Sequence, residues 1–366
     1  MHFAAASSAP VRCASLGALA GRGARARGAD EWEGADPVPA HRTVAQWRVA
    51  RVPAKVNLFL AVRGVRDDGY HELTTVLQTV SVYDEVRATL RADAERYQHP
   101  AARHRMRLEL APGDAAVPTG EDNLAVRAGR VLGAATGLLA EAPSERDRPR
   151  DPRTVLELDK AIPVAGGMAG GSADAAGALV ALNDLWECGL SREELRDLAA
   201  ELGSDVPFCV VGGTALATGR GTALARVLCR GRFDWVAVPD ETPLATAEVY
   251  KAWDTHCAPS EVEPDAVLQA LRARDAVALG AALHNDLEDA AFSLRPDLAD
   301  RKQRLLDAGA LGAVLSGSGP TLLALASDPD HARDLARDVR GWCRREPLVA
   351  HSPAGGPELR GEGGAP

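Results

Sequence analysis

The segment Pro163–Asp174 constrains this chain more than any other, because its twelve residues include four glycines and a serine. Glycine lets backbone N–H groups turn toward a ligand without steric penalty. A helix that starts near Ser172 would direct the positive end of its dipole at the same place. The segment follows a strand-like stretch, 154–159, and precedes a long alanine-rich stretch. The pattern predicts a phosphate-binding loop, and the alternative is a flexible turn that merely joins two elements.

The two most familiar phosphate loops do not fit this segment. A Walker A loop needs a lysine directly after its last glycine, and none of the four lysines in the chain follows a glycine. A dinucleotide-binding turn needs an acidic residue some 20 positions further on, at the end of a second strand. Here that stretch is Asn183–Trp186, which is typical of a helix.

Composition narrows the class of protein. With 366 residues and 46% hydrophobic content, the chain can form one large or two medium domains. A net charge of -9 argues against nonspecific binding to nucleic acid. The longest apolar candidate for a membrane span, 161–182, is interrupted by glycines, Ser172 and Asp174. Six scattered cysteines without a C-x-x-C pair indicate neither zinc nor disulfides, so we expect a reducing, cytoplasmic location.

The two ends of the chain differ in composition from its middle. Residues 1–48 contain no acidic residue before Asp30, which indicates a transit peptide, a disordered tail or a translated upstream stretch. Glycine and proline near the other end predict a disordered tail over 346–366. Between them we expect a first domain over 49–230 and a second over 231–345.

Hydrophobic periodicity predicts interleaved strands and helices, and therefore an α+β fold. A capping box at Ser191 and Glu194 predicts the start of a helix, and 142–153 is expected to be a solvent-exposed excursion. The expected strands are 48–52, 55–62, 75–83, 86–90, 103–110, 154–159, 210–218, 222–228, 235–238 and a pair about a glycine turn in 312–325. The expected helices follow Ser172 and Ser191, and also cover 123–136, 246–253, 264–273, 276–283, 295–308 and 329–340.

Two charged residues stand out beside the glycine segment. Lys55 lies between apolar neighbours in a predicted strand, where it is either an edge solubiliser or a charge held in a site. Asp205 follows a helix end, where an aspartate is most often a cap. Phosphoryl transfer needs a phosphate cradle and a group that orients or deprotonates an alcohol, so the combination favours a site.

Five motifs together resemble the GHMP small-molecule kinases. They occur in the order and spacing of that family, and the resemblance covers about residues 49 to 326. The motifs are Pro53–Leu58, Gly69–Leu73, Pro163–Asp174, Gly203–Phe208 and Leu315–Thr321. The glycine loops are shared by the whole family, whereas Ala-Lys-x-Asn-Leu with Gly-Tyr-His is more specific. That pair is similar to the branch that phosphorylates the 2-hydroxyl of a cytidine-diphosphate-linked methylerythritol for isoprenoid synthesis.

The resemblance implies a two-domain GHMP kinase architecture, with a ribosomal-S5-like first domain, a ferredoxin-like second domain and the active site between them. Asp205 would take the proton from the substrate hydroxyl, and Lys55 would stabilise the developing alkoxide and polarise Asp205. ATP with Mg²⁺ would be the cofactor, with metal ligands unassigned. The ATP phosphates would lie on the segment formed by Pro163, Val164, Ala165, Gly166, Gly167, Met168, Ala169, Gly170, Gly171 and Ser172. Ala165 and Ala169 stand where many relatives have glycine, so the loop departs from the family pattern there.

The resemblance also implies a pocket for the cytidine diphosphate moiety of a small-molecule substrate. Tyr70 and Tyr250 would stack on the two faces of cytosine, and His71 would hydrogen-bond its edge. Asn57 and Thr246 are further candidates for polar contacts. From the local pattern alone, either tyrosine could equally be a packing residue. We expect no nucleic-acid or membrane partner, and a monomer or homodimer.

Two alternatives stay open. Another GHMP kinase, for homoserine, mevalonate or a sugar, would share the glycine loops. A noncatalytic S5-like RNA-binding module would share the first domain, although the acidic balance argues against it.

Overall fold

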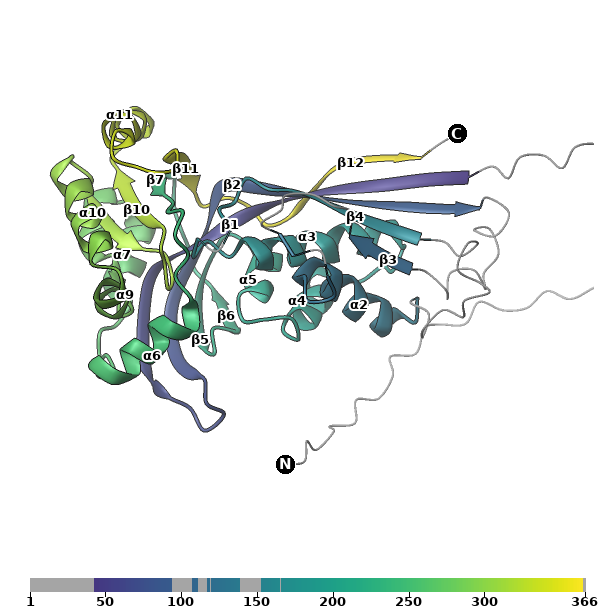
Figure 1. Cartoon of the computed structure of the whole chain (residues 1–366), viewed down its shortest axis with the longest axis horizontal. Helices are drawn as coiled ribbons and strands as arrows, with labels where there is room; N and C mark the ends of the chain where they lie inside the picture. Colours follow the sequence, from purple (N-terminus) through teal and green to yellow (C-terminus); the bar gives the residue numbers. More distant parts are fainter. Residues whose placement is uncertain are drawn as a thin grey trace, which may run out of the picture. The chain divides into compact units, whose positions relative to one another are not determined.

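Two long strands, β1 (Thr43–Val65) and β2 (His71–Asp93), form an antiparallel hairpin that is the base of the first sheet. The turn between them closes as the Arg66 N–H donates to the Tyr70 carbonyl at 2.7 Å. Figure 1 shows a computed structural model of the chain, which describes residues 43–93, 107–110, 117–118, 120–138, 153–164 and 166–364. All of these belong to one compact unit, 41–366.

The first sheet has eight strands and runs β12-β1-β2-β4-β3, with β5 and β6 continuing from β2 and β8 pairing with β1. Its β3–β4 and β1–β8 pairs are parallel, and the others are antiparallel. The remaining strands of this sheet are β3 (Arg107–Leu110), β4 (Arg153–Asp159), β5 (Thr214–Gly219), β6 (Ala223–Arg226), β8 (His284–Asn285) and β12 (Glu358–Gly364).

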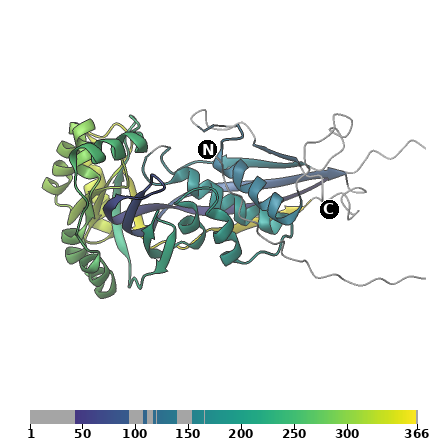
Figure 2. The same ribbon diagram turned by 90° about the horizontal axis from the view of Figure 1, so that it is seen from below.

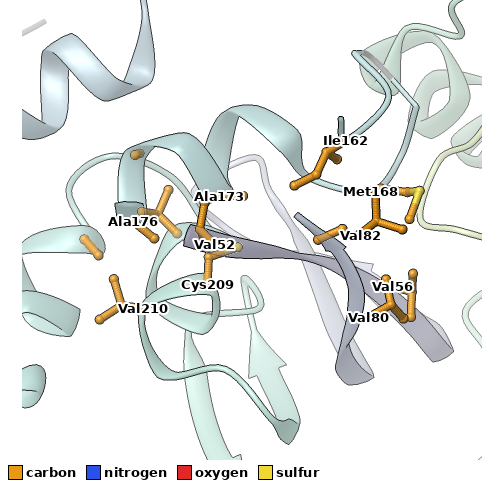
Figure 3. Packing of buried hydrophobic residues seen from close by; sticks show 14 of the residues in the cluster. Val52, Val56, Val80, Val82, Ile162, Met168, Ala173, Ala176, Cys209 and Val210 are labelled. Atoms are coloured by element: carbon orange, nitrogen blue, oxygen red, sulfur yellow. The ribbon is translucent and has the colours of Figure 1, made fainter. Parts of the chain in front are cut away.

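A group of helices packs on this sheet, and α3 is the central one. Because α3 is rich in alanine, it is buried on nearly all sides and lies close against β1 and β2. Figure 3 shows Ala173 and Ala176 of α3 directed toward Val52 of β1 and toward Cys209 and Val210 of the neighbouring short helix. The four helices are α2 (Leu124–Thr136), α3 (Gly170–Leu185), α4 (Arg192–Ala199) and α5 (Val206–Val211).

The second sheet is antiparallel, with four strands in the order β11-β7-β10-β9. Figure 2 shows the green helices gathered about its yellow-green strands. The strands are β7 (Phe233–Val238), β9 (Gly312–Leu315), β10 (Leu322–Ala326) and β11 (Leu348–Ser352). The helices of this part are α6 (Thr246–His256), α7 (Asp265–Ala273), α8 (Ala276–Ala282), α9 (Glu288–Leu294), α10 (Pro296–Asp307) and α11 (Pro329–Arg340). The mixed fold and the capping box at Ser191 are confirmed.

The prediction of a disordered tail over 346–366 is wrong. Residues 348–352 form β11 on β7, and residues 358–364 form β12 on β1. Glycine and proline gave a misleading signal because pairing with two existing strands satisfies the tail's backbone, and Ala350 and Ser352 are buried. At the other end, β1 begins at Thr43, six residues before the expected start of the first domain at residue 49.

Smaller corrections concern the middle of the chain. Residues 210–213, expected as strand, are the end of α5 and a two-glycine turn, because a helix of six residues gives too short a periodic signal. The short elements α9 and β8 were not predicted. Most of the excursion at 142–153 lies outside the described residues. No helix in the described part of the chain is long and apolar enough to cross a membrane.

Candidate active site

The glycine loop is anchored at both ends by buried apolar side chains. Ile162, just after β4, and Met168 are both almost fully buried in the main core, as Figure 3 shows. These two side chains therefore hold this part of the loop against the core. Helix α3 begins at Gly170, two residues before the expected start. Its N-cap residue, Ala169, has φ 57° and ψ 38°, the left-handed conformation that glycine adopts more easily.

A second glycine turn, residues 316–319, lies directly on the first loop. The Ser316 hydroxyl donates to the Gly167 carbonyl at 3.0 Å, and the Thr321 N–H donates to the Gly166 carbonyl at 3.3 Å. A Cβ on Gly167 would lie 2.2 Å from the Ser316 carbonyl oxygen, and its φ is 77°. Position 167 therefore requires glycine both for its backbone conformation and for the space between the two loops.

Lys55 and Asp205, 150 residues apart in the chain, meet beside these loops. Lys55 Nζ lies 3.3 Å from Asp205 Oδ2. The Lys55 side chain is 6% exposed, and that of Asp205 is 40% exposed. Lys55 is therefore no edge solubiliser, and Asp205 makes no capping hydrogen bond at the start of α5. The pair presents one shielded cation and one accessible carboxylate.

A short chain of hydrogen bonds fixes the surroundings of Lys55. Its Nζ donates to Asn57 Oδ1 at 2.9 Å, and Asn57 Nδ2 donates to Thr75 Oγ1 at 2.8 Å. The Thr75 hydroxyl then donates to the Phe59 carbonyl at 2.6 Å. All of these side chains are buried, so each hydrogen bond restricts the next side chain to one orientation.

The aromatic side chains of Tyr70, His71 and Tyr250 lie together and form an aromatic wall of the site. The rings of His71 and Tyr250 are 4.5 Å apart and tilted by 32°, and His71 Nε2 lies 2.7 Å from Asp254 Oδ1. Burial, and then the charge of Asp205, raise the pKa of Tyr250, so its hydroxyl stays protonated. Tyr70 is 54% exposed, and the Arg220 guanidinium lies 4.3 Å above its ring. One ring face of each tyrosine is thus already in contact with a neighbour.

One cavity of about 1140 Å³ collects these groups. This volume exceeds the usual range for a single small ligand, so it can admit a nucleotide and a second substrate together. The predicted residues that line it are Lys55, Asn57, Tyr70, His71, Gly166, Gly167, Ala169, Gly170, Gly171, Ser172, Asp205, Thr246 and Tyr250. Pro163, Val164 and Met168 do not line it, and Ala165 lies outside the described residues. Thr246 also contacts the second turn, because its hydroxyl is 2.8 Å from that of Ser318.

Some residues of the site were not predicted. Arg220 lines the cavity, and its Nε is buried without a hydrogen-bond partner among the described residues. Its place between Gly219 and Gly221 was a signal that could have drawn attention to it. Thr75, by contrast, has no local signal, because only the paired strands bring it to Asn57.

Among the described residues, no group of three or more His, Cys, Asp or Glu could hold a metal ion by itself.

Comparison with known proteins adds sequence relatives to this geometry. The chain matches the family models described as GHMP kinases N terminal domain, over residues 123–213, and GHMP kinases C terminal, over residues 267–345. A Nocardioides sp. protein named 4-diphosphocytidyl-2-C-methyl-D-erythritol kinase is 47% identical over 312 residues, which cover 84% of this chain and 98% of that protein. A Thermobifida fusca protein of the same name is 47% identical over 322 residues, covering 84% and 96%.

A solved structure is similar as well. The crystal structure of a 4-(cytidine 5'-diphospho)-2C-methyl-D-erythritol kinase is 32% identical and has a TM-score of 0.65. The match covers 84% of this chain and all of the other, at 100%.

Proposed function

Since the chain belongs to the GHMP kinase family, we propose that it is an ATP-dependent kinase that phosphorylates the 2-hydroxyl of 4-diphosphocytidyl-2-C-methyl-D-erythritol. The products are the 2-phosphate and ADP, and the reaction belongs to the non-mevalonate route to isoprenoid precursors. The observation that carries the proposal is the Lys55–Asp205 pair at 3.3 Å in the cavity that the glycine loop lines.

The exposed carboxylate of Asp205 suits it to be the general base. It takes the proton of the substrate hydroxyl as the oxygen attacks the γ-phosphorus, and the bond to the β-phosphate oxygen breaks. Lys55, held by Asn57, keeps a positive charge beside that carboxylate and the developing alkoxide. Because the Lys55 side chain is only 6% exposed, water screens its charge less than at the surface.

The glycine loop binds the ATP phosphates with its backbone amides, at the start of a helix of 16 residues. The helix dipole and unpaired N–H groups favour an anion there, without a lysine in the loop. Mg²⁺ bound to the nucleotide would neutralise charge on the β- and γ-phosphate oxygens. The two glycine turns touch at Gly167, so the loop geometry depends on residues from both parts of the chain.

Substrate choice depends on the aromatic wall. Tyr70, His71 and Tyr250, with Asn57 and Thr246, are the residues that we propose for the cytidine diphosphate moiety.

In the described part of the chain five cysteines are free thiols, which supports a cytoplasmic location. The two family models lie on either side of the domain boundary that we propose near residue 230.

The test is ADP release measured with ATP, Mg²⁺ and three acceptors side by side. The diphosphocytidyl substrate should be turned over, whereas homoserine and mevalonate should give background rates. Equal turnover of all three acceptors would contradict the proposed specificity. Turnover of homoserine alone would assign the chain to another branch of the family.

A further inference from the structure

A second lysine–aspartate cluster lies at the glycine loop, away from the cavity lining. Lys160 Nζ is 2.6 Å from Asp174 Oδ2 and also contacts Asp84. The three side chains are between 0% and 6% exposed. A Cβ on Gly170 would lie 3.3 Å from Lys160 Nζ, so the ammonium is next to the start of α3. Two carboxylates share one ammonium, and the fully ionised cluster carries one net negative charge.

The cluster connects both ends of the loop to the sheet. Asp84, on β2, accepts hydrogen bonds from the N–H groups of Ala161 at 2.7 Å and Ile162 at 2.8 Å, where the chain enters the loop. Asp174 is the fifth residue of α3, one turn after the chain leaves the loop. Lys160 joins the two carboxylates. A change in this cluster must therefore move the segment that carries the phosphate-binding amides.

We propose that Asp84, Lys160 and Asp174 are positioning residues for the nucleotide, which hold the loop in place and set its phosphate affinity through their combined charge. The inference rests on the proposed ATP site at Gly166–Ser172. On this proposal, Asp84, Lys160 and Asp174 affect the affinity for the nucleotide, whereas Lys55 and Asp205 take part in the transfer step.

Asp174 can change its charge near neutral pH. Its Oδ1 is buried and has no hydrogen-bond partner among the described residues. Burial raises the pKa of Asp174 to about 7, Lys160 opposes that shift, and Asp84 adds to it. With Asp174 protonated the cluster is neutral, and with Asp174 ionised it carries a negative charge close to the phosphate loop. ATP should therefore bind more tightly at pH 6 than at pH 8.

Other charged or titratable groups come from the elements packed around α3. Burial, and to a smaller extent the negative charges of Asp205 and Asp174, raise the pKa of the Cys209 thiol, so it stays neutral. These groups are Lys55 on β1, Asp205 and Cys209 at α5, Arg127 and Arg130 on α2, and Arg192 on α4. Among the described residues, none of them makes an ion pair with Asp174.

The experiment is the dissociation constant of a fluorescent methylanthraniloyl-ATP at about pH 6 and pH 8. Wild type is compared with Asp174→Asn and with the control Asp184→Asn, which changes an exposed carboxylate on the same helix. From pH 6 to pH 8, the dissociation constant should rise about tenfold more in wild type and in the control than in Asp174→Asn. A tenfold change is a common size for coupling between two sites. Titration of the nucleotide itself is the same for all three proteins. Equal pH dependence in all three would overturn the proposal.

The acceptor is absent from this measurement, so a wrong substrate would leave its result unchanged. At saturating ATP, Asp174→Asn should keep kcat and change only KM for ATP, whereas a general structural defect would lower kcat as well.

If Asp174→Asn does not fold, carbon-13 NMR of aspartate carboxyls in the wild-type protein decides the matter. One buried carboxyl should titrate near pH 7, and ATP should move its midpoint to higher pH, because binding linkage is reciprocal. A midpoint that ATP leaves unchanged would overturn the proposal.

Discussion

The two lysine–aspartate groups use the same residue types in opposite environments. At Lys55 the cation is shielded, while the Asp205 carboxylate is 40% exposed and faces the cavity. At Lys160 the cation and both carboxylates are at most 6% exposed. An exposed carboxylate can reach a substrate proton, whereas a buried one acts only through charge and position. Burial therefore distinguishes the two groups, and we propose that the exposed one takes part in the chemistry while the buried one positions the nucleotide.

The largest expected effect is on kcat, when the Lys55–Asp205 pair is broken. Asp205→Asn removes the proposed base and should lower kcat by about 10²- to 10⁴-fold, because a positioned base contributes that much. Affinity for ATP should stay within about twofold, since the loop amides are untouched. ADP release and nucleotide titration measure the two quantities. Full activity in Asp205→Asn would contradict the proposed mechanism, and Asp184→Asn is the matched control.

The next prediction tests the contact between the two glycine turns, which touch at Gly167. Gly167→Ala places a Cβ 2.2 Å from the Ser316 carbonyl and should lower kcat/KM for ATP on the order of 100-fold. Gly213→Ala is the control, because Gly213 has the same φ of 77° but open space around its Cβ position. Similar losses in both variants would show that backbone strain, rather than the contact between the turns, is responsible.

A third prediction concerns stability and the buried group. The folded-state pKa of Asp174, about 7, lies above its ordinary value, so the folded protein binds this proton more tightly than the unfolded chain. Its contribution is present at low pH and is lost as pH rises through 7, by at most about 1.4 kcal/mol for each pH unit. Asp174→Asn removes this loss. Urea denaturation of both proteins at about pH 5 and pH 7 should show the difference; parallel changes would contradict it.

The smallest effect concerns the loop itself. Ala169 holds a left-handed conformation at the start of α3, which costs an L-residue roughly 1–2 kcal/mol. Ala169→Gly should therefore stabilise the fold by about 1 kcal/mol, measured by urea denaturation. Ala176→Gly, at a buried position of the same helix, should destabilise it by at least that amount, because it also removes a packed methyl group. Loss of stability in Ala169→Gly would contradict the strain.

The sequence predicts the elements whose signals are local, and it does not predict those that depend on tertiary pairing. Periodicity and caps predicted long elements such as α2 and α11, because their signals lie within a few turns. It failed at α5 and at the tail, where tertiary pairing overrides composition.

The two charged groups show the same limit. The proximity of Lys55 and Asp205 was reached only through family resemblance, since no local pattern relates residues 150 positions apart. Asp84 and Lys160 gave no signal at all, because strand pairing and the turn after β4 bring them together.

Single-turnover phosphoryl transfer, followed by rapid quench across ATP concentrations, tests the division between the two groups most directly. Asp205→Asn should lose the transfer rate and keep the ATP dissociation constant. Asp174→Asn should keep the transfer rate at saturation and change the pH dependence of that constant. If both variants lose the same parameter, the two groups do not have separate roles.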